Sequence, residues 1–336
     1  MKATVKLGLL VVLVFAVQVG FAQSGPKNAA ARAFTQQVLQ HLPGHFGALP
    51  ARTALNASQD ALAAGVTAKV YKFSTNDYPG AALSMTWDIY LTTAVGYFNY
   101  ESITPQTYNT AFELVGGVYK VILVPGAAQG SIATGINSSS QIVGFYTDSS
   151  DVTHAFYDSA GTIETVDNPA GTGTAAFDIN DSGDIVGQFV DTSGNIHGYL
   201  DVGGTFTQID DPNAPTGGTV ATGINDSGEI VGYWEDSMYN YHGFILSGVA
   251  GTFTEVDFPL ASDTYLFGVN KGGEVAGYYT DASGVSHGLI YSNGAFSTVD
   301  VSGASCTELA RIKSNSGAIT GVFADALGEG HALQGH

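Results

Sequence analysis

From about residue 67 to the C-terminus, short apolar runs rich in Val, Ile, Tyr and Phe alternate with turns rich in Gly, Asp and Asn. In the clearest stretch these runs lie at 219–224, 229–235, 242–246 and 252–257. Short β-branched and aromatic runs bounded by turn residues are typical of β-strands. The Asn-Asp-Ser-Gly link at 225–228 contains residues that tolerate positive φ, which suits a tight hairpin. The pattern therefore predicts a unit of four antiparallel strands.

The same unit recurs along the chain, and each copy is recognised by a glycine four residues before a turn aspartate. The five clear copies carry this anchor at Gly144, Gly187, Gly232, Gly277 and Gly321, with separations of 43, 45, 45 and 44 residues. A degraded sixth copy is anchored at Gly96. A period of about 45 residues with four strands is the size of one β-propeller blade. A β-sandwich array and a parallel β-helix are the alternatives that such a repeat leaves open.

The two ends of the repeat region complement each other. The last copy ends at His331–His336 without a fourth strand, whereas Phe73–Pro79 reproduces the fourth-strand spacing ahead of the first copy. A strand supplied from the opposite end of the chain closes a ring and removes a sheet edge, which an open array does not require. We therefore predict an all-β fold over residues 67–336: a six-bladed β-propeller of four-stranded antiparallel blades, with the last blade closed by the N-terminal strand. The innermost strands, such as Ala221–Ile224, should line the central channel.

An aspartate and a histidine recur at fixed positions in five copies. The pairs are Asp148 with His154, Asp191 with His197, Asp236 with His242, Asp281 with His287, and Asp325 with His331. One such pair could act as a base with its orienting carboxylate. A catalyst needs one asymmetric constellation, however, and a feature present in five copies serves each blade. We predict a structural Asp–His hydrogen bond across the turn between the second and third strands, and we assign no catalytic or metal-binding residue.

Composition and charge narrow the classes of partner. The chain carries a formal net charge of −19 at pH 7, so it repels phosphate backbones and anionic headgroups, and nucleic-acid and membrane-surface functions are disfavoured. Its single cysteine, Cys306, excludes an intramolecular disulfide and falls in a predicted inner strand, where a small buried residue is expected.

The N-terminus predicts export. Residues 1–22 combine Lys2 and Lys6, an apolar run at Leu9–Val17, and small residues before a cleavage site after Ala22, as in a secretory signal peptide. An uncleaved membrane anchor is the alternative. Residues 23–66 are an Ala-rich leader or tether, partly helical over 29–42. The mature chain should therefore be periplasmic, on the cell surface or secreted, without a membrane span.

No cofactor is predicted, although one segment resembles the start of a calcium loop. Asp178–Asp184 places oxygen-bearing side chains at alternate positions before a glycine. No bidentate Glu follows at the required distance, and hairpin-turn chemistry explains the segment as well. In the other copies the first position is Gly135, Gly223, Gly268 or Ile312. The chain also has no Gly-rich phosphate loop, which makes an enzymatic function less favoured without excluding it.

The His-Ala-Phe and His-Gly-Phe tripeptides, in fixed phase with the hairpin Gly223-Ile-Asn-Asp-Ser-Gly-Glu-Ile-Val-Gly, resemble the HAF family of probable extracellular repeat proteins of bacteria. The resemblance covers about residues 67–336. It weakens in the first copy, where Ile89 and Thr92 replace the usual Asn and Gly, and in the last, where Ser314 stands at the Asn position. The resemblance implies export and a repeat fold, and it supplies no ligand, reaction or site residue.

Departures from the repeat indicate where a ligand could bind. The fourth copy replaces small polar turn residues with a Tyr-rich segment, and the first copy is Tyr-rich in the same region. Exposed aromatic rings beside carboxylates are typical of sugar or peptide recognition. The candidate ligand-contacting residues are Trp234, Tyr239, Tyr241, Tyr97, Tyr100 and Tyr108. We predict an exported binding module for an extracellular glycan or protein. A propeller hydrolase or lyase with its site at the channel mouth, and a structural envelope protein, are the alternatives.

Overall fold

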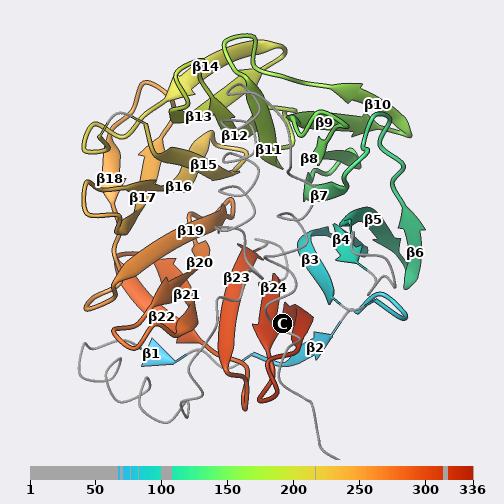
Figure 1. Ribbon diagram of the computed structural model, residues 1–336. Coiled ribbons are helices and arrows are strands. Elements are labelled where there is room, and N and C mark those ends of the chain that lie inside the picture. The colour runs from blue at the N-terminus through green and yellow to red at the C-terminus, as the bar shows by residue number, and fades with distance from the viewer. Residues whose placement is uncertain are drawn as a thin grey trace, which may run out of the picture.

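The computed structural model describes residues 67–68, 71–75, 77–81, 83–99, 108–215, 217–312 and 317–335. The predicted signal peptide, the helix predicted at 29–42 and Tyr100 lie outside these residues. All 25 elements of the described chain are β-strands, arranged as six sheets around a central axis (Figure 1). The predicted six-bladed β-propeller of four-stranded antiparallel blades is confirmed. No helix that could cross a bilayer occurs in the part of the chain that the structure describes.

The blades follow one another in sequence, and each is numbered from its innermost strand outward. Blade 1 consists of β3 (Leu83–Tyr90), β4 (Thr93–Asn99), β5 (Thr110–Val115) and β6 (Val118–Val121). Blade 2 consists of β7 (Ser131–Ile136), β8 (Gln141–Thr147), β9 (Thr153–Ser159) and β10 (Thr162–Thr165). Blade 3 consists of β11 (Gly173–Ile179), β12 (Ile185–Val190), β13 (Ile196–Val202) and β14 (Thr205–Ile209).

Blade 4 is the copy from which the strands were predicted. It consists of β15 (Thr219–Ile224), β16 (Glu229–Glu235), β17 (Tyr241–Ser247) and β18 (Phe253–Glu255). Blade 5 consists of β19 (Asp263–Val269), β20 (Val275–Thr280), β21 (Ser286–Ser292) and β22 (Ala295–Val299). The first two strands of blade 4 agree with the sequence prediction residue for residue. As predicted, β15 is the innermost strand of its blade (Figure 1).

Blade 6 is assembled from both ends of the chain. It consists of β23 (Cys306–Ile312), β24 (Ile319–Ala324), β25 (Gly330–Gly335) and the N-terminal β2 (Phe73–Thr75). Antiparallel pairing of β2 with β25 aligns Phe73 with Gly335, and this places β2 outermost, as predicted. A second N-terminal strand, β1 (Thr67–Ala68), pairs in parallel with β22 of blade 5, which the sequence did not indicate.

The anchor glycine of each copy is required by packing within the blade. A Cβ at Gly232 would lie 1.9 Å from the Val220 carbonyl oxygen and 2.8 Å from the Phe244 ring. The same close approach of an inner-strand carbonyl occurs at Gly144, where the Cβ would lie 2.0 Å from the Ile132 oxygen. Only glycine leaves room for the neighbouring strand at this position.

The central channel is too narrow for six side chains at one level. Every inner strand contains a bulge that turns the chain toward the axis. A Cβ at Gly268 would lie 2.9 Å from the Ala310 oxygen and from the Arg311 Cα, so a side chain does not fit there. The residues immediately after the six bulges are Asp88, Gly135, Asp178, Gly223, Gly268 and Arg311. Three blades thus carry no side chain at this level, and the other three carry charged ones.

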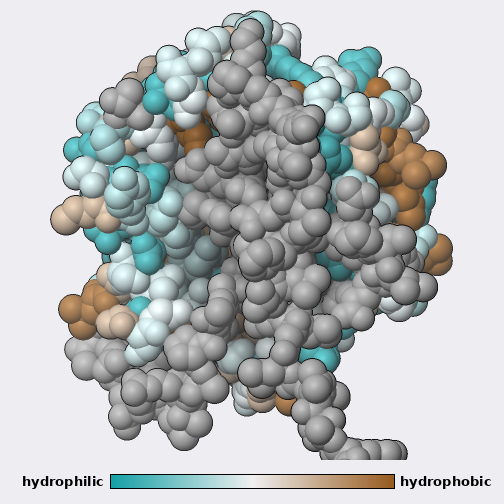
Figure 2. All heavy atoms as spheres, viewed as in Figure 1, coloured by the Kyte–Doolittle hydropathy of each residue, from teal (hydrophilic) through white to brown (hydrophobic). Residues whose placement is uncertain are grey.

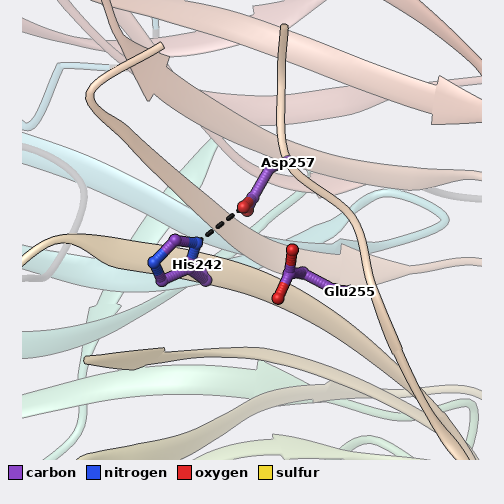
Figure 3. A group of neighbouring side chains, drawn as sticks. All are labelled: His242, Glu255 and Asp257. Atoms are coloured by element: carbon purple, nitrogen blue, oxygen red, sulfur yellow. Dashed lines mark hydrogen bonds and ion pairs between the residues drawn. The ribbon is translucent and has the colours of Figure 1, made fainter. Parts of the chain in front are cut away.

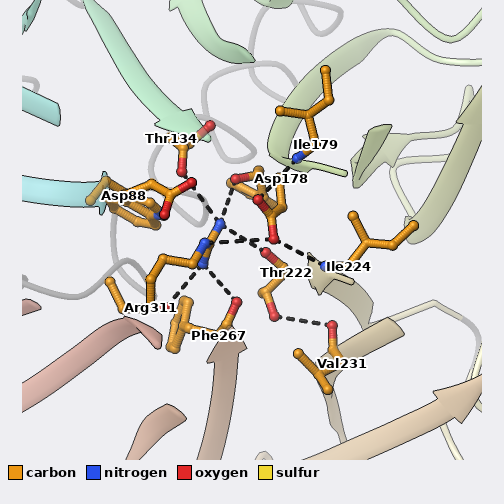
Figure 4. Close-up of polar contacts among 12 residues, drawn as sticks. Asp88, Thr134, Asp178, Ile179, Thr222, Ile224, Val231, Phe267 and Arg311 are labelled. Carbon is orange, nitrogen blue, oxygen red and sulfur yellow. Dashed lines mark hydrogen bonds and ion pairs between the residues drawn. The ribbon is translucent and has the colours of Figure 1, made fainter. Parts of the chain in front are cut away.

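Arg311 fills the channel at this level (Figure 4). Its guanidinium donates to the carbonyl oxygens of the bulge residues in five blades, at distances of 2.6 to 3.3 Å. The acceptors are Thr134, Phe177, Thr222, Phe267 and Ala310. In blade 1 the corresponding carbonyl, that of Trp87, accepts the Thr320 hydroxyl at 2.7 Å. One side chain therefore ties five inner strands to the axis.

Two buried carboxylates accompany Arg311. The Asp178 Oδ2 lies 3.6 Å from the Arg311 Nε and accepts the Ile224 amide of the next blade at 3.0 Å. Asp88 likewise accepts the Ile136 amide of blade 2 at 2.9 Å. Because buried charges are tolerated only when paired and hydrogen-bonded, these contacts account for three ionisable residues in the channel.

Candidate functional site

The repeated histidine is held between two aspartates, as blade 4 illustrates. The His242 Nδ1 lies 2.6 Å from an oxygen of Asp257, which follows the fourth strand (Figure 3). The Nε2 lies 3.6 Å from an oxygen of the turn aspartate Asp236. The sequence interpretation paired the histidine with the turn aspartate alone. The structure corrects this, because the shorter hydrogen bond joins the third strand to the end of the fourth.

The other four copies have the same arrangement. The closer distances, from Nδ1, are 2.6 Å for His154 to Asp167, 2.8 Å for His197 to Asp210, 2.9 Å for His287 to Asp300 and 3.1 Å for His331 to Asp77. The longer distances, from Nε2, are 3.5 Å for His154 to Asp148, 3.5 Å for His197 to Asp191, 3.6 Å for His287 to Asp281 and 3.7 Å for His331 to Asp325. In blade 6 the partner Asp77 comes from the N-terminal segment, so this contact also closes the ring.

The histidine rings are further fixed by stacking. Each packs on the aromatic ring two residues after the anchor glycine, with centroids 4.5 to 5.3 Å apart. These rings belong to Tyr146, Phe189, Trp234, Tyr279 and Phe323. A ring clamped between two carboxylates and an aromatic face is well suited to hold a blade together.

The carboxylates raise the pKa of these histidines. For His154 the hydrogen bond to Asp167 is the main cause of the raised pKa. For His242 and His287 burial acts to lower the pKa, but the hydrogen bonds and charges of the flanking aspartates outweigh it and the net shift is upward. The turn aspartate also caps its own loop: Asp236 accepts the side-chain and backbone N–H groups of Asn240 and the Met238 amide, contacts that lower its pKa to about 2.

One group in blade 4 has a donor set that could hold a metal ion. His242, Glu255 and Asp257 each offer a ligand atom, and these atoms lie within 4.8 Å of one another (Figure 3). Asp325, Glu329 and His331 form a similar group in blade 6. In both groups the histidine already hydrogen-bonds an aspartate of the repeat.

The segment that resembled a calcium loop directs its oxygens elsewhere. Asn180 Oδ1 accepts the amides of Ser182 and Asp184 within the hairpin, while its Nδ2 donates to the Asn225 carbonyl of the next blade. Asp178 points into the channel, toward Arg311. In the last copy the structural counterpart of Asp178 is Arg311, and not Ile312 as the sequence alignment had it.

A groove of about 260 Å³ lies between blades 3 and 4, on the face that carries the loops joining second to third strands. One wall is the turn at Gly194–Ile196, and the other is the blade 4 turn, with Glu235, Asp236 and Tyr239. Its floor is the bare backbone of Gly217 and Gly218, both at positive φ. A narrow inner end continues toward the channel and is lined by Gln188, Ile196, Gly218, Val220, Tyr233, Glu235 and Tyr241.

Three residues of blade 4 that line this groove depart from the repeat. Glu235 stands where the other blades have Asn99, Thr147, Val190, Thr280 and Ala324. Tyr241 stands where they have Asn109, Thr153, Ile196, Ser286 and Gly330. Tyr239 stands where four of them have Asp151, Gly194, Gly284 and Gly328. The departures gather in one place and give the groove its acidic and aromatic character.

The predicted ligand-contacting residues fall into different environments. Tyr239 is 78% exposed at the rim of the groove, and Tyr241 is half-buried at its inner end. Trp234 and Tyr97 are corrections: both are buried, because Trp234 stacks on His242 and Tyr97 packs into the core around the channel. Gln188, which lines the inner end, was missed. Comparing its position across the copies, where all the others are aromatic or apolar, would have found it.

Tyr108 lies apart from the groove, in blade 1, and is partly exposed. Blade 1 has no His–Asp set, because Thr110 and Leu123 occupy those positions. It exposes apolar side chains instead, among them Val118 at 69% and Leu123 at 81%. Brown spheres mark this rim near β6 in Figure 2.

No protein-family model matches the chain, and no curated protein matches it. Among solved structures, the match to TolB from Acinetobacter baumannii has a TM-score of 0.50 at 11% identity and covers 72% of this chain and 63% of that chain. The β-propeller domain of the Trilobed protease from Pyrococcus furiosus matches with a TM-score of 0.47 at 10% identity, covering 76% and 94%. The fucose-specific lectin from Aleuria aurantia matches with a TM-score of 0.46 at 12% identity, covering 78% and 93%. These likenesses concern the fold alone.

Proposed function

We propose that the chain is an exported binding module whose ligand, a glycan, enters the groove between blades 3 and 4. The observation that carries the proposal is Tyr239. This side chain is 78% exposed, and its backbone has a φ of +67°. At the same turn position three other blades have glycine, the residue that adopts positive φ without strain.

Tyr239 is unfavourable for the fold in two ways. A non-glycine residue at positive φ costs on the order of 1–3 kcal/mol, and an exposed aromatic ring recovers little of that cost through packing. Strain of this kind gathers where a side chain serves a ligand. A ligand stacked on the ring would supply the missing contact.

The lining of the groove supports a sugar as that ligand. Aromatic faces pack against the apolar faces of sugar rings, while carboxylate and amide groups hydrogen-bond hydroxyls. Tyr239 and Tyr241 supply rings, Glu235 a carboxylate and Asn195 an amide. A volume of about 260 Å³ lies just below the usual range for small-molecule sites, about 300–1,000 Å³, which suits one residue of a longer chain.

The His–Asp sets support a scaffold role and argue against a catalytic one. Five blades carry the same clamp, with the same pair of carboxylates, so none of them is singled out as an acid or base. Export belongs to the proposal and rests on the signal-peptide pattern and on the resemblance to HAF repeats.

A glycan array combined with a pull-down from extracellular material tests the proposal. We expect the full chain to retain a glycan and the variant Tyr239→Gly to lose it. Asp151→Gly is the matched control, since it places glycine at the same turn position of blade 2, outside the groove.

Unchanged glycan binding by Tyr239→Gly would show that the groove is not the glycan-binding site. Retention of a protein and no glycan would favour the protein-binding alternative. Absence of any ligand in both assays would favour a structural envelope role.

A further inference from the structure

The side chain of Gln188 lines the inner end of the groove. Gln188, on β12, is 2% exposed, and its side chain makes no hydrogen bond with the residues that the structure describes. Its amide offers an oxygen acceptor and two N–H donors to a group that enters this space. The other blades have no amide at this position, where their residues are Tyr97, Phe145, Tyr233, Tyr278 and Val322.

A carboxylate faces the same space. Glu235 is half-buried. Burial is the main cause that raises its pKa, and the nearby charge of Asp236 raises it further, while a hydrogen bond from Tyr241 acts to lower it. Asp236 is already engaged, since its oxygens accept the Met238 and Asn240 amides and lie near His242. No lysine or arginine is among the residues lining either part of the groove. Glu235 is therefore the charge that a ligand would meet.

The size and walls of the inner end restrict what fits. Its volume of about 10 Å³ is that of a single water-sized group. The rings of Tyr233 and Tyr241 line it, with centroids 5.9 Å apart. Aromatic faces attract cations, and an ammonium group has three N–H donors for a carboxylate and an amide oxygen.

We infer that this inner end, between Gln188, Glu235 and Tyr241, is a subsite for a primary ammonium group of the ligand. The inference rests on the proposed function for the groove and narrows its ligand to an amine-bearing one, such as an amino sugar. A lysine side chain offers the same group, so the test separates the two sources.

The test is calorimetric titration of the full chain with two matched pairs of probes. One pair is a tetramer of glucosamine and its fully N-acetylated counterpart. The other is a short lysine peptide and its acetyl-lysine counterpart. We expect the glucosamine tetramer to bind, with acetylation weakening it at least about tenfold, because a charge-assisted hydrogen bond is worth about 1.5–3 kcal/mol. Binding of the lysine peptide alone would support the ammonium subsite and would show that the ammonium group belongs to a protein ligand.

Two variants test whether Glu235 and Gln188 bind the ammonium group. Glu235→Gln should weaken glucosamine binding at least about tenfold, whereas the control Glu164→Gln, on the exposed β10 of blade 2, should not change it. Gln188→Leu should also weaken binding, yet its melting temperature should stay equal, because the Gln188 side chain makes no hydrogen bond with the residues that the structure describes. A merely structural role of Gln188 would lower the melting temperature instead.

Equal or tighter binding of the N-acetylated tetramer would overturn the ammonium subsite while leaving the groove as a glycan site. Failure of both amine probes to bind would overturn it as well. The proposed function would then be judged separately, by whether any glycan retained on the array depends on Tyr239.

Discussion

The Arg311 side chain contacts five of the six blades. It donates hydrogen bonds to carbonyls of five inner strands and offsets the buried charge of Asp178. The sequence did not reveal this role, because the alignment of the last copy placed Ile312 opposite Asp178. The bulge in β23 decides the register, and a bulge is set by how six strands crowd one axis, which no single copy encodes.

We expect Arg311→Met to lower the free energy of unfolding by about 3–5 kcal/mol, because it leaves Asp178 buried without its cation and several carbonyls without a donor. Urea denaturation followed by tryptophan fluorescence measures the change. Lys120→Met is the control: Lys120 is exposed and pairs with Glu113 at the surface, so the change should be below about 1 kcal/mol. A loss below about 1 kcal/mol for Arg311→Met would show that the carbonyl contacts do not hold the ring.

At the scale of the element, the blade could be predicted from the sequence, because each of its strands follows a local sequence pattern. Apolar runs, the Asn-Asp-Ser-Gly hairpin and the anchor glycine correctly predicted the first and last residues of β15 and β16. The partner of the histidine was not readable, since both aspartates recur with the same period and only the pleat and length of the fourth strand decide which one is closer. The environment of Trp234 was misjudged for a similar reason: alternate residues of β16 face opposite sides, and the side that holds Trp234 is covered by His242.

The His–Asp clamps predict how stability depends on pH. His154, His242 and His287 have pKa values raised above the ordinary 6.5, so they bind protons more tightly in the folded state. Their stabilisation is complete below pH 6.5 and is lost as the pH rises through the folded-state pKa values. Urea midpoints should therefore fall as the pH rises above 6.5. A variant with glutamine at all three positions should show a flatter profile, and a rising midpoint in the native chain would contradict the account.

Acid should weaken the fold through the turn aspartates. Hydrogen bonds within its turn lower the pKa of Asp236 to about 2, and Asp191 is lowered to the same value against the opposing effect of burial. This stabilisation is complete above the ordinary pKa of 3.8 and is lost as the pH falls toward 2. Melting temperatures between pH 5 and 2 measure it. Replacing both residues with asparagine should reduce the slope, and an unchanged slope would assign acid sensitivity to other carboxylates.

At the scale of the whole molecule, the ring is closed by β2, a strand that pairs with β25 from the other end of the chain. Asp77 accepts the Ala332 amide at 3.0 Å and lies 3.1 Å from the His331 Nδ1, the arrangement that Asp167 makes with Ala155 and His154. The sequence predicted this closure because the missing strand reappeared with its spacing intact. It could not predict the parallel addition of β1 to blade 5, since two residues carry no periodic signal.

Asp77→Ala and Asp167→Ala remove the same contacts but should differ in effect. β10 remains tied to β9 by a short hairpin, whereas β2 and its partner β25 come from opposite ends of the chain, so we expect β2 to dissociate once Asp77 is lost. We expect Asp77→Ala alone to speed hydrogen exchange in β25 and to populate oligomers through the freed edge. Exchange mass spectrometry and size-exclusion chromatography make the comparison. Equal behaviour of the two variants would mean that closure does not depend on this strand.

In our proposal the propeller is a scaffold, and recognition occurs where blades 3 and 4 break the repeat. Hydrogen exchange across the full chain, with and without the glycan that binds most tightly on the array, tests it most directly. We expect the glycan to slow exchange in the segments that line the groove, 194–196, 217–218 and 235–241, and to leave the equivalent turns of blades 2, 5 and 6 unchanged. Protection spread equally over the five His–Asp turns, or confined to blade 1, would show that the groove between blades 3 and 4 is not the binding site.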